Sequence, residues 1–210
     1  MKRRSFLQGS GALSLLGLAG CAAMGGSAPP SKAKVLVVGG GYGGATAAKY
    51  MRLLSDYRID VVMVDPGERF ISCPLSNLVL GGSKTINDLS LPYDKLRTRH
   101  GVTVIRDTVA SIDAAKKVAR LASGPTIAYD KLVLSPGVEL MFDSIEGLKA
   151  AQADGRILQA WKAGQETTRL RRQLESMPDG GVYALTIPEA PYRCPPGPYE
   201  RACLVADYFS

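Results

Sequence analysis

Two kinds of hydrophobic pattern follow one another along the first half of the chain. Short apolar runs rich in β-branched residues predict buried strands at 34–38, 61–64, 102–105 and 131–134. Between the first two of these runs, residues 45–54 have the periodicity of a helix with small residues on its early face. Strand, helix and strand in this order indicate a parallel sheet covered by helices, so we expect an α/β fold.

Further elements are expected between these strands. Residues 93–99 predict a short helix, and three short runs predict a small antiparallel meander at 109–113, 118–121 and 126–129. Residues 66–82 contain Gly, Pro, Ser and Asn and predict a long connection. Connections of that length are often functional.

The pattern changes after residue 150. Residues 156–177 form a long amphipathic segment and predict one helix, whose inward side chains would be Ile157, Leu158, Trp161, Leu170 and Leu174. Residues 182–187 predict a strand that opens a second unit, and 199–209 predict a helix after a proline-dense loop.

These elements divide the chain into three expected parts. Residues 1–30 are a leader and tether, 31–147 the first part of a dinucleotide-binding domain, and 148–210 a linker helix with the start of a second domain. One strand and one helix do not complete such a unit. We therefore expect a Rossmann-like domain followed by a second, truncated Rossmann-like domain.

The N-terminus predicts export. Arg3 and Arg4 precede Ser-Phe-Leu and an uncharged run from 11 to 23, which is typical of a twin-arginine signal peptide and a periplasmic protein. The run is shorter than the ~20 apolar residues that a transmembrane helix needs, so no membrane span is expected after its removal. Cys21 follows Leu-Ala-Gly, as in a lipobox; either it is lipidated, or cleavage near Ala28 removes it.

Composition excludes some classes of protein. With 46% hydrophobic and 21% charged residues the chain is an ordinary globular protein. The net charge of +7 includes three basic residues at 2–4, and the remaining charge is too mild and scattered to indicate nucleic-acid binding. His100, the single histidine, precedes a glycine in an expected turn, so no metal site is predicted. The chain has no Cys-x-x-Cys-His for attaching a c-type haem.

The most specific local motif lies between the first strand and the first helix. Gly39, Gly41 and Gly44 have the spacing G-x-G-x-x-G, which suits a tight turn, a close approach to pyrophosphate and close helix–strand packing. The following helix N-terminus attracts phosphate. Asp65 ends the second strand, where a carboxylate typically binds ribose hydroxyls. The motif predicts a dinucleotide, either FAD or NAD.

A first resemblance favours FAD. The expected meander and Val-Leu-Ser-Pro-Gly at 133–137 resemble the closing segment of the FAD domain in flavoproteins of the disulfide reductase type, which have two dinucleotide-binding domains. The resemblance implies that Pro136 and Gly137 contact the cofactor.

Two stretches make the resemblance more specific. Phe-Ile-Ser-Cys-Pro-Leu-Ser-Asn-Leu-Val-Leu-Gly-Gly at 70–82 resembles the flavin-site loop of the flavoprotein subunit of flavocytochrome c sulfide dehydrogenase. Tyr-Arg-Cys-Pro-Pro-Gly-Pro-Tyr-Glu-Arg-Ala at 192–202 is similar to the second-domain loop of that family, and 159–164 to its linker helix. The resemblance extends over about 34–210.

That resemblance implies a function. Cys73 would be joined through a thioether to the flavin 8α-methyl group, and Cys194 would be half of a redox-active disulfide facing the flavin. Hydrosulfide would attack that disulfide, and electrons would pass through FAD to a c-type cytochrome subunit. Alternatively Cys73 is a buried free thiol and Cys194 a structural loop cysteine.

The residues around Cys194 bear on its role. Pro195, Pro196 and Pro198 have no N–H to donate to a pyrophosphate, so this loop is not suited to bind NAD(P)H. Cys203 is the local candidate for a disulfide partner, but we expect it to be packed within a helix. The partner of Cys194 is therefore expected beyond residue 210.

Two other functions stay open. One is a sulfide:quinone or NAD(P)H-linked oxidoreductase of the same fold. The other is a non-catalytic fragment that binds flavin or cytochrome.

Overall fold

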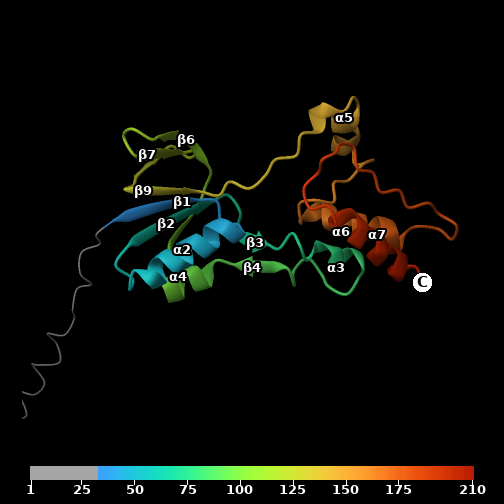
Figure 1. The fold of residues 1–210 in the computed structure, drawn as a ribbon, viewed down its shortest axis with the longest axis horizontal. Helices are drawn as coiled ribbons and strands as arrows, with labels where there is room; N and C mark the ends of the chain where they lie inside the picture. The colour runs from blue at the N-terminus through green and yellow to red at the C-terminus, as the bar shows by residue number, and fades with distance from the viewer. Residues whose placement is uncertain (1–32) are drawn as a thin grey trace, which may run out of the picture.

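The computed structural model describes residues 33–210 (Figure 1). The predicted twin-arginine signal, Cys21 and the tether lie outside the described residues. The strands are β1 (Lys34–Val38), β2 (Asp60–Asp65), β3 (Arg69–Ile71), β4 (Ser90–Pro92), β5 (Thr103–Arg106), β6 (Val109–Asp113), β7 (Val118–Leu121), β8 (Thr126–Ala128) and β9 (Lys131–Leu134). The helices are α2 (Tyr42–Leu54), α3 (Ser76–Leu80), α4 (Asp94–His100), η1 (Phe142–Ser144), α5 (Leu148–Ala153), α6 (Gln165–Glu175) and α7 (Gly197–Tyr208).

A parallel sheet organises the first half of the chain, as predicted. Its strand order is β5-β2-β1-β9, so β1 lies between β2 and β9. The meander β6-β7-β8 is antiparallel, also as predicted. The α/β fold with a parallel sheet is therefore confirmed, and the glycine motif follows one of its central strands.

Both faces of the sheet are covered. Val35, Val37 and Met63 are buried under α2 and α4, whereas Leu36 and Val64 on the opposite face pack with buried residues of the meander. Figure 1 shows α2 and α4 on one side of the sheet and β6–β7 on the other. Burial on two faces explains why these strands are continuous apolar runs and not alternating ones.

A second cluster of helices lies apart from the sheet. Leu80 of α3, Leu174 of α6 and Val205 of α7 form one small buried core. Figure 1 shows these three helices together, with the β3–β4 ribbon leading from the sheet toward α3. Segments more than 90 residues apart in the chain are thus neighbours here.

Several expected elements differ from the structure. The connection at 66–82 contains β3 and α3. Of the helix expected over 156–177, only α6 is helical. Residues before it form a turn, in which Gln159 Oε1 accepts the N–H groups of Trp161 (2.8 Å) and Lys162 (2.7 Å). The segment that resembles a linker helix is therefore not helical, and Ile157, expected to face inward, is 46% exposed.

The strand expected at 182–187 is also absent from the described structure. Within residues 33–210 no strand pairs with this run, and Val182 is 89% exposed. An extended segment needs a partner for its backbone groups before it becomes a strand. The region expected to open a second domain contains α6 and α7 and, among the described residues, no paired strand.

Candidate functional site

The ends of three parallel strands converge at the glycine motif. The N–H of Gly39 donates to the carbonyl oxygen of Val64 at 2.8 Å, and the N–H of Ser135 donates to that of Val38 at 2.8 Å. Gly39 has a φ of +95°, and a Cβ at this position would overlap the carbonyl oxygen of Ser135. Because of these contacts, Ser135 and Pro136 lie beside the glycine turn, and Gly137 follows them in the chain.

The structure requires glycine at Gly44 but not at Gly41, the other two glycines of the motif. A Cβ at Gly44 would overlap the carbonyl oxygen of Gly39, so Gly44 permits the close packing of α2 on the turn. Gly41 has no heavy atom within 4 Å of where its Cβ would lie, and its φ of −67° is open to any residue. Packing within the described chain does not require glycine at position 41.

The space at Gly41 fits a phosphate. Neither a side-chain cap nor an acidic residue occupies the first turn of α2. The first N–H groups of a helix have no partner within the helix, and together with the helix dipole they favour an anion. A dinucleotide pyrophosphate would therefore be held by backbone N–H groups between Gly41 and Gly44.

The carboxylate of Asp65 organises the turn next to this space. It accepts the N–H of Gly40 at 2.6 Å and that of Gly67 at 2.7 Å. Asp65 is half-buried beside the glycine turn, at the position where the acid of such a motif would bind a ribose. Asp65 lies at the end of β2, as predicted. Its hydrogen bonds to Gly40 and Gly67 also hold the glycine turn against the following loop.

Tyr93 is a site residue that the sequence did not reveal. It is 5% exposed, and its hydroxyl donates to the carbonyl oxygen of Gly40 at 3.0 Å. Burial raises the pKa of Tyr93 to about 12, and the nearby negative charge of Asp65 acts in the same direction. Tyr93 directly precedes α4 and packs in the same buried cluster as Leu96 of that helix. In the sequence, this apolar spacing was the one signal that Tyr93 would be buried.

The loop that carries Cys73 is docked on the start of α2. The hydroxyl groups of Tyr42 and Ser72 lie 2.5 Å apart, and the ring of Tyr42 meets that of Phe70 edge to face at 4.6 Å between centroids. Tyr42 directly follows Gly41. The structure thus brings the Cys73 loop to the glycine turn, although the two are separated by 30 residues.

Cys73 also contacts the second half of the chain. Its side chain is half-buried, and the thiol donates to the carbonyl oxygen of Trp161 at 2.5 Å. On the neighbouring α3, the buried Asn77 accepts a hydrogen bond from Nε of Arg201 at 2.9 Å. This hydrogen bond joins the segment at 70–82 to the segment at 192–202, so both recognised motifs meet here.

Cys194 lies in the turn before α7. It is exposed, has a φ of +60°, and its carbonyl oxygen accepts the N–H of Gly197 at 2.9 Å. In the described part of the chain Cys73, Cys194 and Cys203 are all free thiols, and no hydrogen bond joins Cys194 to Cys73. The expectation that Cys203 is packed is wrong: it lies in α7 but is exposed, whereas Val205 is the buried residue of that helix.

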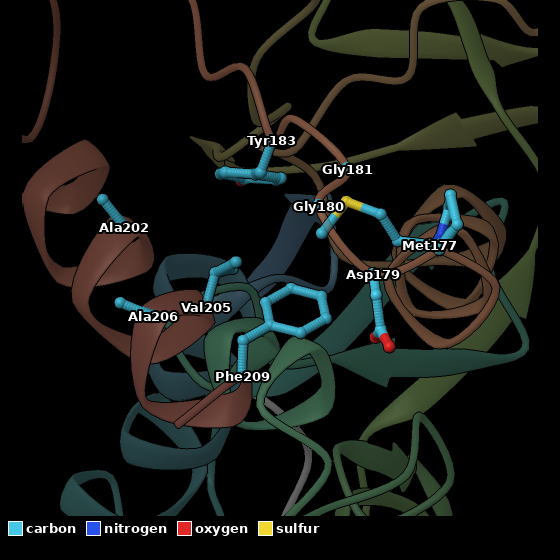
Figure 2. A pocket seen from close by; sticks show the side chains of 10 residues that line it. Met177, Asp179, Gly180, Gly181, Tyr183, Ala202, Val205, Ala206 and Phe209 are labelled. Carbon is cyan, nitrogen blue, oxygen red and sulfur yellow. The ribbon is translucent and has the colours of Figure 1, made fainter.

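One hollow in the described structure lies away from this chemistry. Figure 2 shows its lining, which includes Tyr183, Val205 and Phe209 and the turn at 177–181; its volume is about 430 Å³. It contains none of the predicted site residues.

Across residues 33–210 no group of His, Cys, Asp or Glu could hold a metal ion. Searching the same residues finds no helix long and apolar enough to span a bilayer.

Comparison with known proteins agrees with this arrangement. Residues 33–174 match the family described as pyridine nucleotide-disulphide oxidoreductase. The chain belongs to this family. Residues 167–210 match the central part of the sulfide dehydrogenase [flavocytochrome c] flavoprotein chain. The resemblance found in the sequence is therefore confirmed, as is the predicted class, an oxidoreductase with a flavin cofactor.

Individual relatives of this oxidoreductase cover unequal parts of it. The sulfide dehydrogenase flavoprotein chain of Chlorobaculum thiosulfatiphilum is 54% identical over 46 residues, which are 22% of this chain and 94% of the relative's recorded sequence. The sulfide:quinone oxidoreductase of Aquifex aeolicus is 25% identical with a TM-score of 0.57, over 68% of this chain and 31% of its own. An NAD-dependent persulfide reductase from A. fulgidus shares the fold at 21% identity, with a TM-score of 0.58 over 68% of this chain and 27% of its own. The chain thus spans about a third of these solved structures.

Proposed function

We propose that this oxidoreductase oxidises hydrosulfide and passes the electrons through a redox disulfide and covalently bound FAD to a c-type cytochrome subunit. Cys194 contributes one sulfur of the disulfide, and Cys73 forms the thioether to the flavin. Gly39, Gly41, Gly44, Asp65, Pro136 and Gly137 surround the dinucleotide.

One observation carries the proposal: the Cys73 loop is docked on the helix whose N-terminus would hold the pyrophosphate. The contact of Tyr42 with Ser72 and Phe70 makes this connection. The thiol of Cys73, next to Ser72 on that loop, would then be close enough to a bound dinucleotide to reach its flavin. The relative from Chlorobaculum thiosulfatiphilum, which is called a flavocytochrome c flavoprotein, supports the cytochrome as electron acceptor.

The chemistry at Cys194 is a thiol–disulfide exchange. Hydrosulfide attacks one sulfur of the disulfide, which gives a persulfide on that cysteine and releases the other cysteine as a thiolate. Re-forming the disulfide, with the outer persulfide sulfur leaving as zero-valent sulfur, releases an electron pair and a proton that a bound flavin would accept. FAD would supply the change from two-electron to one-electron transfer. Cys194 suits attack because its side chain is exposed to solvent. Its partner cysteine stays a prediction.

The test is sulfide-dependent haem reduction by the complete protein with its cytochrome subunit. Cys194→Ser should lower the rate at least about 100-fold, because no disulfide can form. Cys203→Ser is the matched control, since Cys203 is a second exposed thiol nine residues away, and it should keep the wild-type rate. Full activity of the Cys194→Ser variant would refute the proposal. Acid precipitation should leave flavin on the wild type and release it from Cys73→Ser.

A second candidate acceptor is a quinone, which the similarity to the Aquifex sulfide:quinone oxidoreductase favours. The same preparation decides between the two acceptors. Reduction of a short-chain quinone faster than of the cytochrome would assign the quinone.

We propose export to the periplasm by the twin-arginine route, on the sequence of residues 3–23. Changing Arg3 and Arg4 to Lys should leave the precursor in the cytoplasm. Lipid on the mature protein would instead identify Cys21 as an anchor.

A further inference from the structure

Tyr42 joins the helix of the glycine turn to the loop that carries Cys73. It is the first residue of α2 and directly follows Gly41, where the space fits a phosphate. Its hydroxyl lies 2.5 Å from that of Ser72, and its ring meets that of Phe70 edge to face. In the described part of the chain no other hydrogen bond joins α2 to this loop. The N-terminus of α2 is therefore linked to the Cys73 loop through this tyrosine.

The contact differs from ordinary core packing. Tyr42 is 56% exposed, so its ring adds little to the core, whereas Ser72 is 4% exposed. The N–H of Ser72 donates to the carbonyl oxygen of Leu89 at 3.0 Å, and its buried hydroxyl is bonded by Tyr42, 30 residues away. The residue before Cys73 is thus held at its backbone by one element and at its side chain by α2.

The far end of the same loop is tied to other elements. Arg171 Nη1 donates to the carbonyl oxygen of Leu80 at 2.7 Å, and the guanidinium lies 4.0 Å from the centre of the Tyr208 ring. Asn77 accepts a hydrogen bond from Arg201. These contacts hold α3 against α6 and α7, and they do not depend on α2.

We propose that Tyr42 is a positioning residue for the covalent attachment of FAD: its hydroxyl holds Ser72, and with it the backbone that carries Cys73, beside the helix that binds the pyrophosphate. This inference rests on the proposed covalent attachment. The Cys73 thiol donates to the carbonyl oxygen of Trp161 and must leave that oxygen before it reacts. Meanwhile the bond between Tyr42 and Ser72 keeps the loop in place, and misplacement of a reacting group by a small distance costs a large factor in rate.

The attachment step balances in atoms and electrons. Cys73 loses its thiol proton, and its sulfur forms a bond to the 8α carbon of the flavin, which loses one hydrogen. The proton and the electron pair from that C–H bond, together with the thiol proton, reduce the flavin by two electrons. Dioxygen takes up these two electrons and two protons as hydrogen peroxide.

Two substitutions remove the hydrogen bond from opposite sides. Tyr42→Phe keeps the ring against Phe70 but leaves the buried Ser72 hydroxyl without a partner, so it should lower the Tm. Ser72→Ala leaves the exposed Tyr42 hydroxyl to water and should change the Tm less. The double variant has no unpaired buried hydroxyl and should regain most of the Tm. Attachment should stay slow in all three variants, because all three lack the bond.

The experiment adds FAD to the complete protein prepared from riboflavin-starved cells. Acid-stable flavin fluorescence at saturating FAD gives the rate of attachment, and quenching of free FAD gives the Kd for non-covalent binding. Tyr42→Phe, Ser72→Ala and the double variant should each slow attachment about tenfold and change the Kd less than about twofold. Tyr50→Phe is the matched control, since it makes the same change on the same helix at a residue that is 48% exposed, and it should keep the wild-type rate.

The double variant separates positioning from stability. Attachment that recovers together with the Tm would show a purely structural role and overturn the inference. Wild-type rates in Tyr42→Phe overturn it too, as does a double variant slowed about 100-fold, because additive effects would mean that the two hydroxyls act independently. If Tyr42→Phe does not fold, Ser72→Ala decides alone.

A second measurement tests Tyr42 without any covalent bond. If the wild type never forms acid-stable flavin, the covalent attachment is refuted, and the role of Tyr42 is decided in a Cys73→Ser background. There, saturating FAD should slow hydrogen exchange in the peptide at 70–75, and Tyr42→Phe should reduce this protection at least about threefold. Equal protection with and without the Tyr42 hydroxyl overturns the inference.

Discussion

Replacing Tyr93 with Phe tests how the glycine turn is held. The hydroxyl of Tyr93 donates to the carbonyl oxygen of Gly40, whose N–H is bound by the carboxylate of Asp65. Phe keeps the packing of a ring that is 5% exposed, but leaves a buried carbonyl without a donor. An unsatisfied buried acceptor costs about 1–3 kcal/mol, so Tyr93→Phe should lower the free energy of unfolding by about 1–2 kcal/mol near neutral pH.

The effect should depend on pH with a definite sign. The pKa of Tyr93 is about 12 in the folded protein against 10.0 for an ordinary tyrosine, because of burial first and the charge of Asp65 second. Above pH 10 the unfolded chain loses this proton while the folded protein keeps it, so stability declines as the pH rises through this range. The full shift corresponds to about 2.7 kcal/mol, and about half of it is lost by about pH 11. The wild-type and Tyr93→Phe curves should therefore nearly meet at about pH 11.

Urea unfolding of the complete protein at intervals between pH 8 and about 11 measures this convergence. Tyr50→Phe is the matched control, since Tyr50 is 48% exposed and its substitution should change stability by less than about 0.5 kcal/mol throughout. If the Tyr93→Phe and wild-type curves stay parallel, Tyr93 does not keep its proton in the folded state, and the account of the turn is wrong.

Three further substitutions or assays test other parts of the site. Gly44→Ala should lower the free energy of unfolding by about 2–3 kcal/mol, because its methyl group would overlap the carbonyl oxygen of Gly39. Gly41→Ala should change the Tm by less than about 2 °C. It should nevertheless weaken FAD binding at least about tenfold in a flavin fluorescence titration. Arg171→Gln should destabilise by about 2 kcal/mol in urea, because Leu80 loses a charged donor and α6 loses a contact to α7; unchanged unfolding would contradict the contacts. NADH should not bleach the flavin under anaerobic conditions, because prolines around Cys194 remove N–H donors; rapid bleaching would show another nucleotide site.

The sheet and the glycine turn could be predicted because their signals are local. The apolar run at 34–38 is continuous where a central strand is buried on both faces, and the glycines follow it at once. Asp65 could be placed for the same reason, since it ends the neighbouring strand. What the sequence did not reveal there was Tyr93, whose importance depends on the packing of α4 against the turn.

The second half of the chain was less predictable because its structure depends on distant contacts. Apolar residues at helical spacing suggested one helix over 156–177, but Gly155 has a φ of +78° and Gln159 bonds the backbone of the following turn. Neither effect appears in a hydrophobic pattern. Asn77 and Arg201 both lie inside recognised motifs, yet only the fold shows that they bond each other.

The contact between α3 and the C-terminal helices sets an order of events during synthesis. A ribosome that has released residues 33–140 has made the glycine turn and the four strands that the structure describes in the parallel sheet. The surroundings of Cys73 are still incomplete at that moment, because Trp161, Arg171 and Arg201 come later in the chain. The glycine turn can therefore form on the nascent chain, but the environment of the thiol that would bind the flavin covalently forms only after residue 201 has emerged. Loading and attachment of the cofactor would then be two successive stages in the maturation of this protein.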